Sequence, residues 1–433
     1  MTDVLRVDPG GSLRGHVRVV SDKSITHRGI ILGWLASGES RIASPNTGGD
    51  CRALLDAVVS LGAVVVEEEG AWRIRGTAGV TSEPETVLDL GNSGTALRLL
   101  AGAVAPSPHV TILTGDASLR SRPMERVAAP LRAMGAVVIT RSGGRAPLVI
   151  RGGPLRPLRH DLPVASAQVK SALLFAGLRS RPGRMVLHEP GPARDHTERF
   201  LRHLGVALET DGGRIAMTCP AQVPAFEVAV PADPSAAAFF AVAAAVTLGS
   251  DVVLEDVGLN PRRMGFLRIL KEMDACIDVV PEGDQEPEPR GRIRIRHGAL
   301  RGVDVPADDV ATFLDEIPIL AVAAAFAQGT TSFQGLEELR HKETDRLETT
   351  ASMIRALGGR VEGTAGGLRI QGAGGEGLAG GSVESRGDHR IAMSAAVAGC
   401  AAGRGVEVRG ARWIGTSDPE FLGHLLSLRG GTP

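Results

Sequence analysis

The chain has 433 residues, of which 43% are hydrophobic and 22% are charged, and this composition provides enough apolar side chains for a large buried core. It excludes a disordered, fibrous or disulfide-stapled protein. The 48 basic and 49 acidic residues nearly cancel, so no overall charge favours nucleic acid or a membrane surface. Aromatic residues make up only 3% and Tyr is absent, which leaves few side chains for stacking on nucleic-acid bases.

The cysteine spacing and the lengths of the apolar segments indicate in which cellular compartment the protein works. Cys51, Cys219, Cys276 and Cys400 are far apart and lack the paired spacing of a zinc site or a redox dithiol. The first residues show no basic region followed by an apolar stretch, so we expect no signal peptide. The longest apolar runs, 236–246 and 317–327, are too short to cross a bilayer. We therefore expect a soluble, cytoplasmic protein.

Two kinds of segment alternate along the chain, and each kind recurs six times. In the first kind, a helix-period segment is followed by a β-branched strand, a Gly turn and a second strand. A Leu or Met near the end of the helical segment marks the same position in each copy, and successive marks are 69 to 84 residues apart. In chain order these residues are Leu61, Met134, Leu204, Met273, Leu357 and Leu426. The longest interval contains the Pro- and Glu-rich residues 281–290, which we interpret as an exposed loop insertion.

The second kind of segment begins with a short polar cluster, continues as an Ala-, Leu- and Val-rich helix, and ends in a strand. Its clusters start at Asp22, Asn92, Ser166, Asp233, Asp315 and Asp388. These helices are apolar all round, which is typical of buried helices. Chance alternation of helices and strands would not keep six copies in phase. We predict an α/β fold of two lobes, each with three βαβαββ units.

The boundary between the predicted lobes falls at a Pro-rich junction near residue 231. We expect residues 21–231 to form one lobe, and residues 1–20 and 232–433 to form the other. Ligands commonly bind in clefts between such lobes, so we expect the active site there.

The polar clusters precede the expected buried helices, whose N-termini carry free N–H groups and attract anions. Ordinary N-capping by Ser, Asp or Asn explains any single cluster equally well. Three clusters, however, contain groups that capping does not require. Lys23 and Arg28 accompany the first, Arg98 the second, and Gln168 with Lys170 the third. We interpret these residues together as a site for a polyanion.

Further charged residues precede helices elsewhere. Arg122 stands before one helix, where it could hold a phosphate or carboxylate through two hydrogen bonds or simply be solvated. Asp315 and Glu316 adjoin a strongly apolar helix, where buried carboxylates are costly unless they are paired or functional. The charged residues 339–347 would usually form a solvated helix face. Lys342 favours a site there, because only four of the 48 basic residues are Lys and Lys can share its proton.

Seven motifs in this order resemble the 5-enolpyruvylshikimate-3-phosphate synthase family, the enolpyruvyl transferases of the shikimate pathway. They are SDKSITHR at 21–28, GNSGT at 91–95, LRSRPM at 119–124, ASAQVKS at 165–171, DEIP at 315–318, KETDR at 342–346 and DHRIA at 388–392. Each motif is weak alone, but seven in order over nearly the whole chain are specific. The resemblance implies two lobes of three βαβαββ units that close on the substrates. It also implies transfer of the enolpyruvyl group from phosphoenolpyruvate to the 5-hydroxyl of shikimate 3-phosphate, by addition and elimination with release of phosphate.

The resemblance further implies a role for individual residues. Those expected to hold shikimate 3-phosphate are Lys23, Ser24, Arg28, Ser166, Ala167, Arg194, Asp315 and Lys342. Those expected to surround phosphoenolpyruvate are Lys23, Gly94, Arg122, Gln168, Arg346 and Arg390. Asp315 would take the hydroxyl proton, Glu343 would exchange a proton with the methylene carbon, and Lys342 would assist. No metal or organic cofactor is implied, glyphosate would inhibit at the phosphoenolpyruvate position, and we expect a monomer.

Two alternatives stay open. A UDP-N-acetylglucosamine enolpyruvyl transferase has the same fold, but it generally carries a reactive Cys, occasionally Asp, in the loop corresponding to residues 115–124. This loop contains no Cys; it does contain Asp116, but its LRSRP pattern at 119–123 fits the shikimate enzyme. A non-catalytic anion-binding paralogue would lose acid–base residues first, yet Asp315, Lys342 and Glu343 are all present. One departure concerns a Lys near the C-terminus that contacts phosphoenolpyruvate in many members. Residues 414–419 supply no Lys.

Overall fold

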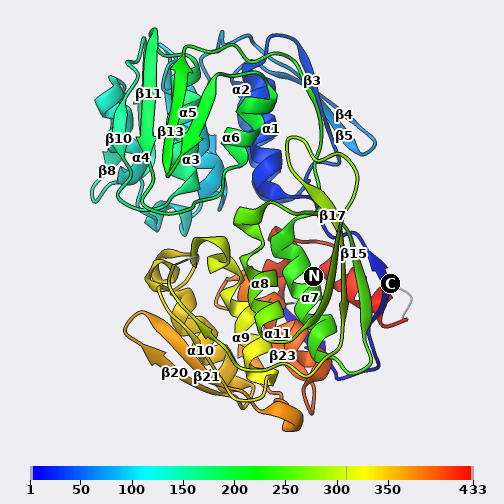
Figure 1. The fold of residues 1–433 in the computed structure, drawn as a ribbon. Helices are drawn as coiled ribbons and strands as arrows, with labels where there is room; N and C mark the ends of the chain where they lie inside the picture. The colour runs from blue at the N-terminus through cyan, green and yellow to red at the C-terminus, as the bar shows by residue number, and fades with distance from the viewer. Residues whose placement is uncertain (1–2, 309, 431–433) are drawn as a thin grey trace. The chain divides into compact units, whose positions relative to one another are not determined.

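The computed structural model describes residues 3–308 and 310–430, and its contacts group the chain into two compact units. We call Ser21–Val230 together with Glu286–Glu288 the N-unit, and Met1–Val20, Pro231–Gln285 and Pro289–Pro433 the C-unit (Figure 1). No helix in the described ranges combines the length and the apolarity needed to span a membrane.

The N-unit contains six helices and three four-stranded sheets. Its helices are α1 (Lys23–Leu35), α2 (Gly49–Ser60), α3 (Gly94–Val104), α4 (Glu125–Met134), α5 (Ala167–Leu178) and α6 (His196–His203). Its strands are β3 (Glu39–Ala43), β4 (Val64–Glu68), β5 (Ala71–Arg75), β6 (Leu88–Asp89), β7 (Val110–Thr114), β8 (Val137–Arg141), β9 (Arg145–Arg151), β10 (Arg159–Asp161), β11 (Gly183–His188), β12 (Leu208–Asp211), β13 (Arg214–Cys219) and β14 (Glu227–Ala229).

The three sheets of the N-unit share one topology, with strand orders β14-β3-β5-β4, β6-β7-β9-β8 and β10-β11-β13-β12. In each, the first pair is parallel and the remaining pairs are antiparallel. Helices α1, α3 and α5 are almost wholly buried, as their uniform apolarity predicts. Helices α3 and α5 approach so closely that a Cβ on Gly102 would lie 2.0 Å from the carbonyl oxygen of Ala172, so only glycine fits there.

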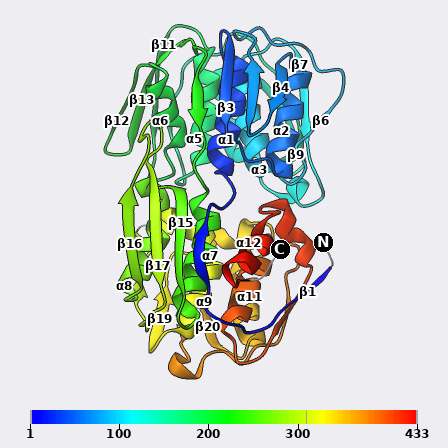
Figure 2. The same cartoon turned by 90° about the vertical axis from the view of Figure 1, so that its right-hand side faces the viewer.

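The C-unit repeats this plan. Its helices are α7 (Pro234–Val246), α8 (Gly265–Glu272), α9 (Ile317–Phe326), α10 (Arg346–Ala356), α11 (His389–Ala401) and α12 (Phe421–Leu428). Its strands are β1 (Val4–Val7), β2 (Arg14–Val17), β15 (Asp251–Gly258), β16 (Cys276–Pro281), β17 (Arg290–Arg296), β18 (Asp304–Val305), β19 (Thr330–Phe333), β20 (Arg360–Thr364), β21 (Gly367–Gln371), β22 (Ser382–Glu384) and β23 (Val406–Arg409). Helices α7, α9 and α11 pack together in the core of this unit (Figures 1 and 2).

The N-terminal segment completes two sheets of the C-unit. Strand β2 is the parallel edge of β16-β17-β15-β2, and β1 pairs antiparallel with β23 in the three-stranded β1-β23-β22 sheet. In the part of the chain that the structure describes, which ends at residue 430, the sixth repeat has α12 but no hairpin of its own. Strand β1 therefore occupies the position that a hairpin strand fills in the other five sheets.

One expectation about the loops was wrong. Residues 281–286 are exposed as predicted, but Pro287 and Glu288 are buried. Glu288 lies in the N-unit, where its Oε1 is 2.7 Å from Nδ1 of His196, which is also buried. The insertion is thus anchored by a buried polar pair, and this pair gives His196 a structural partner.

Candidate active site

The starts of α1, α3 and α5 confirm that the polar clusters cap buried helices. The side chains of Asp22, Ser93 and Ser166 accept hydrogen bonds from the backbone N–H groups of residues 25, 96 and 169. Capping uses only the acceptor capacity of a hydroxyl, so Ser166 still has a proton to donate. The remaining N–H groups of each first turn provide the anion-binding character of a helix N-terminus.

A hydrogen-bonded group joins the starts of α3 and α5. The Gln168 amide donates to the Thr95 hydroxyl at 2.9 Å, and its oxygen accepts from Nη1 of Arg98 at 2.6 Å. Arg122 approaches from the loop before α4. Its Nη1 would lie 3.1 Å from a Cβ on Gly94, and its Nη2 donates to the Asn92 oxygen at 2.6 Å. Gly94, Arg122 and Gln168, predicted from distant motifs, are therefore neighbours.

Lys23 and Arg28 on α1 differ in accessibility. Lys23 is partly exposed, and its Nζ lies 2.9 Å from Oδ2 of Asp50, a partner that no sequence signal indicated. Arg28 is buried, and its guanidinium donates to the Thr197 and Ser171 hydroxyls and to the Ser24 carbonyl. Burial lowers the pKa of Arg28 to about 10, so the group stays cationic at neutral pH.

The sequence interpretation of Lys170 as part of an open polyanion site was wrong. Its side chain is 0% exposed, and its Nζ lies 2.7 Å from carboxylate oxygens of both Glu189 and Glu198. The same nitrogen donates to the carbonyl of Ala193 at 3.3 Å, the residue before Arg194. Lys170 therefore ties the segment that carries Arg194 to helix α5, while Arg194 itself is half-buried. The two glutamates lie outside the motifs, so the sequence offered no signal for this pairing.

The second group of predicted residues is a charged network in the C-unit. Asp315 lies in a short 3₁₀ turn, with Oδ1 at 3.1 Å from Nζ of Lys342 and 3.4 Å from Nη1 of Arg346. Arg346 also contacts the Glu343 carboxylate and, at 2.8 Å, that of Asp388. Three carboxylates from three sequence motifs therefore surround one guanidinium.

Burial and charge act against each other in this network. Burial alone would lower the pKa of Arg346, whose side chain is 1% exposed, but the carboxylates of Asp388, Glu343 and Asp315 outweigh it and raise that pKa. Burial likewise opposes ionisation of Asp388, but Arg346 outweighs it and lowers the pKa of Asp388. Asp315 and Glu343 keep 19% and 23% of their side chains exposed, so both can meet a ligand.

Arg390, at the start of α11, is the remaining predicted residue of the C-unit. Its Nη1 donates to the backbone carbonyl of Asp315 at 2.9 Å and lies 3.4 Å from Oε1 of Glu316. Glu316 is buried and also accepts a hydrogen bond from the Ser235 hydroxyl at 2.5 Å. Neighbours thus compensate Oε1 of Glu316, as the cost of burying a carboxylate requires, whereas its Oε2 is buried with no hydrogen-bond partner among the described residues. Arg390 positions the turn that presents Asp315.

The two groups suit different chemistry. The first, which we call the N-unit group, consists of the starts of α1, α3 and α5 with Lys23, Arg28, Arg98, Arg122 and Gln168. Helix N-termini with arginines and a lysine form an arrangement that binds phosphates and carboxylates. The second, the C-unit group, consists of Asp315, Lys342, Glu343, Arg346 and Asp388. It places the accessible carboxylate of Asp315 beside the ammonium of Lys342, an arrangement suited to proton transfer. Among the described residues, no cluster of three or more His, Cys, Asp or Glu side chains could hold a metal ion.

Comparisons with known proteins agree with the motifs. The family model described as "EPSP synthase (3-phosphoshikimate 1-carboxyvinyltransferase)" matches residues 7–425. A 3-phosphoshikimate 1-carboxyvinyltransferase from Thermus thermophilus is 49% identical over 428 residues, covering 98% of this chain and 99% of the relative. One from Gluconobacter oxydans is 46% identical over 426 residues, covering 97% and 96%.

Solved structures show the same fold. An EPSP synthase from Acinetobacter baumannii matches with a TM-score of 0.88 and 39% identity, covering 99% of this chain and 97% of the other. An enolpyruvyl transferase from Streptomyces tendae matches with a TM-score of 0.78 and covers 98% and 97%. Its identity of 18% shows a shared fold alone.

Proposed function

Because the chain belongs to the EPSP synthase (3-phosphoshikimate 1-carboxyvinyltransferase) family, we propose that it transfers the enolpyruvyl group of phosphoenolpyruvate to the 5-hydroxyl of shikimate 3-phosphate and releases phosphate. This is a step of aromatic amino acid biosynthesis. The observation that carries the proposal is the full-length match together with the Asp315–Lys342 pair, whose nitrogen and oxygen lie 3.1 Å apart. An anion-binding protein without catalysis has no need for that pair.

The N-unit group is proposed to bind the anionic parts of the substrates. Lys23, Ser24, Ser166, Ala167 and Arg194 are assigned to shikimate 3-phosphate, supported by their places at or near the starts of α1, α5 and α6. Arg28 is also assigned to shikimate 3-phosphate. Because Arg28 is buried, we propose that it supports the more accessible residues of this group. Both substrates are anions, so bringing them together requires fixed positive charges and N–H groups.

Phosphoenolpyruvate is proposed to contact Gly94, Arg122 and Gln168 of the N-unit group, with Lys23. Their mutual proximity supports this assignment, because Gly94 leaves space beside the Arg122 guanidinium. Arg346 and Arg390 of the C-unit share the assignment. Arg346 contacts three carboxylates in this structure, and the remaining N–H of its five donors is the one proposed to contact the ligand.

The C-unit group is proposed to move the protons. Asp315 accepts the proton of the 5-hydroxyl as the hydroxyl oxygen attacks C2 of phosphoenolpyruvate, and Glu343 gives a proton to the methylene carbon, which becomes a methyl group. Lys342 lies within hydrogen-bond distance of Asp315 and assists in both binding and proton transfer. Loss of one proton from the new methyl group to Glu343, together with loss of phosphate from C2, then regenerates the double bond. Such proton transfer contributes about 10²–10⁴-fold to a rate.

The finer assignments of partners and setting belong to the same proposal. We propose shikimate 3-phosphate and phosphoenolpyruvate as substrates, glyphosate as a competitor of phosphoenolpyruvate, and a monomeric enzyme of the cytoplasm. Analytical ultracentrifugation of the purified chain tests the monomer, and sedimentation as a dimer at micromolar concentration would contradict it.

The function is tested by mixing the purified protein with both substrates and following phosphate release together with the enolpyruvyl product by ³¹P and ¹H NMR. UDP-N-acetylglucosamine replaces shikimate 3-phosphate in a parallel reaction. Product only with shikimate 3-phosphate supports the proposal, and product only with the nucleotide sugar would identify the rival transferase. Binding without product in either reaction would identify a non-catalytic paralogue. Asp315→Asn serves as the control that retains size but removes the proton acceptor.

A further inference from the structure

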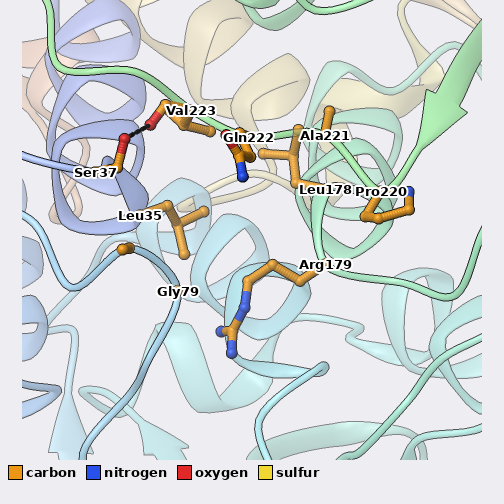
Figure 3. A pocket seen from close by; sticks show the side chains of 10 residues that line it. Leu35, Ser37, Gly79, Leu178, Arg179, Pro220, Ala221, Gln222 and Val223 are labelled. Atoms are coloured by element: carbon orange, nitrogen blue, oxygen red, sulfur yellow. Dashed lines mark hydrogen bonds between the residues drawn. The ribbon is translucent and has the colours of Figure 1, made fainter.

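A pocket of about 280 Å³ lies in the N-unit at the C-terminal ends of α1 and α5 (Figure 3). Leu35, Leu178 and Val223 form its apolar walls, and Arg179 and Gln222 bring polar groups to it. In Figure 3 the Arg179 side chain runs along one side of the pocket toward Gly79. Helix α5 has 12 residues, which corresponds to about 18 Å between its two ends. The pocket is therefore separate from the residues assigned to the substrates at the start of α5.

Arg179 is half-buried and lies at the wall of this pocket. Its Nη1 is buried and has no hydrogen-bond partner in the ranges that the structure describes. Burial lowers the pKa of Arg179, and none of the carboxylates in the described ranges raises it again. Arg28 and Arg346, by contrast, donate to hydroxyl, carbonyl or carboxylate oxygens. The rest of the half-buried side chain lines the pocket, and a guanidinium without a carboxylate partner among the described residues can pair with a carboxylate from outside the chain.

The backbone beside Arg179 leaves room for its side chain. Gly79 adopts a φ of +83°, and a Cβ at this position would lie 3.0 Å from Nε of Arg179. Any other residue would be strained there and would push against the guanidinium. On the opposite side, the Ser37 hydroxyl is engaged with the carbonyl of Val223 at 3.4 Å. The guanidinium is thus the strongest donor that the pocket offers to a ligand.

We propose that this pocket binds a small monocarboxylate with an apolar body. The carboxylate pairs with the guanidinium of Arg179, and the apolar body packs against Leu35, Leu178 and Val223. A single guanidinium matches one carboxylate through two parallel hydrogen bonds, whereas a phosphate dianion in an apolar pocket would require further donors. The volume lies just below the usual range for ligand pockets, about 300–1,000 Å³, and this suits a ligand of single-ring size.

The test uses ¹⁹F NMR of 4-fluorobenzoate, with uncharged 4-fluorobenzamide as the matched ligand control. Native protein, Arg179→Gln, Gln222→Trp and Arg181→Gln are titrated with saturating shikimate 3-phosphate present. Gln222 is an exposed residue of the pocket, so the larger Trp side chain should fill the pocket without disturbing the core. Arg181 is exposed, lies two residues from Arg179 and does not line the pocket.

Native protein and Arg181→Gln should bind 4-fluorobenzoate with a Kd on the order of 1 mM, as expected for so small a ligand. Arg179→Gln and Gln222→Trp should each weaken binding by about 10-fold or more, since a charge-assisted hydrogen bond is lost or the space is filled. Circular dichroism checks that each variant is folded, and Gln222→Trp decides the test if Arg179→Gln is not. Undetectable binding to native protein, equal binding of 4-fluorobenzamide, or unchanged binding in both pocket variants would each overturn the proposal.

Discussion

Replacing Gly94 by Ala adds one methyl group at the first turn of α3. Gly94 is buried and lies outside the left-handed backbone region, so the backbone accepts an alanine. The new Cβ would lie 3.1 Å from Nη1 of Arg122 and 3.1 Å from Nη1 of Arg98. Both contacts are tighter than ordinary van der Waals packing. Because both atoms end flexible side chains, we expect the guanidinium groups to shift by a few tenths of an ångström while the fold is retained.

The size of the effect follows from the crowding. Overpacking a tight site costs about 1–3 kcal/mol, which corresponds to roughly five- to 150-fold in affinity if one ligand bears the whole cost. Phosphoenolpyruvate is the shorter anion and glyphosate the longer, so the methyl group should obstruct glyphosate more. We expect a marked rise in the inhibition constant of glyphosate in Gly94→Ala and a smaller rise in KM for phosphoenolpyruvate.

The assay measures glyphosate inhibition at several phosphoenolpyruvate concentrations for native protein, Gly94→Ala and Gly49→Ala. Gly49 is the first residue of α2, and a Cβ added there meets nothing within 4 Å, so this control should behave like native protein. Native inhibition should be competitive with phosphoenolpyruvate. Equal inhibition constants for the native and Gly94→Ala proteins would refute the assignment of Gly94 to this ligand.

Three further variants test other parts of the structure. Lys342→Arg should lower kcat by about 10²–10⁴-fold, because a guanidinium does not share its proton. The control Lys271→Arg, at an exposed position, should leave kcat unchanged. Normal turnover of Lys342→Arg would show that Lys342 takes no part in the mechanism. Lys170→Met leaves two buried glutamates without their cation and should lower the free energy of unfolding in urea by about 3–5 kcal/mol; an unchanged midpoint contradicts this. Burial raises the pKa of Asp418 to about 7 from an ordinary 3.8, so the folded protein holds a proton that the unfolded chain releases, and stability falls as pH rises between these values. Asp418→Asn should therefore be more stable than native protein at pH 8, with a smaller difference at pH 4, and an equal difference at both pH values refutes the pKa shift.

Much of the candidate site was predictable because its signals are local. An apolar helix preceded by Asp or Ser specifies both burial and an N-cap within a few residues, as at Asp22 and Ser166. The same holds for the repeated strand–turn–strand pattern, so the repeats and the helix starts could be predicted from spacing alone. A site at Asp315 and Lys342 was likewise indicated by charged residues adjoining an apolar helix and by the rarity of Lys, while the roles proposed for them rest on the family resemblance.

The rest depended on contacts between segments far apart in the chain. The sequence around Lys170 indicated an anion-binding site, yet the Lys170 ammonium is paired with the carboxylates of Glu189 and Glu198. Tertiary packing determines which residues pair with a buried charge, and sequence spacing does not show it. Strand β1 joins β23 across some four hundred residues, and no periodicity encodes that pairing. The unpaired Arg179 and its pocket arise in the same way, where the ends of two buried helices and a distant loop leave a space that only the tertiary structure defines.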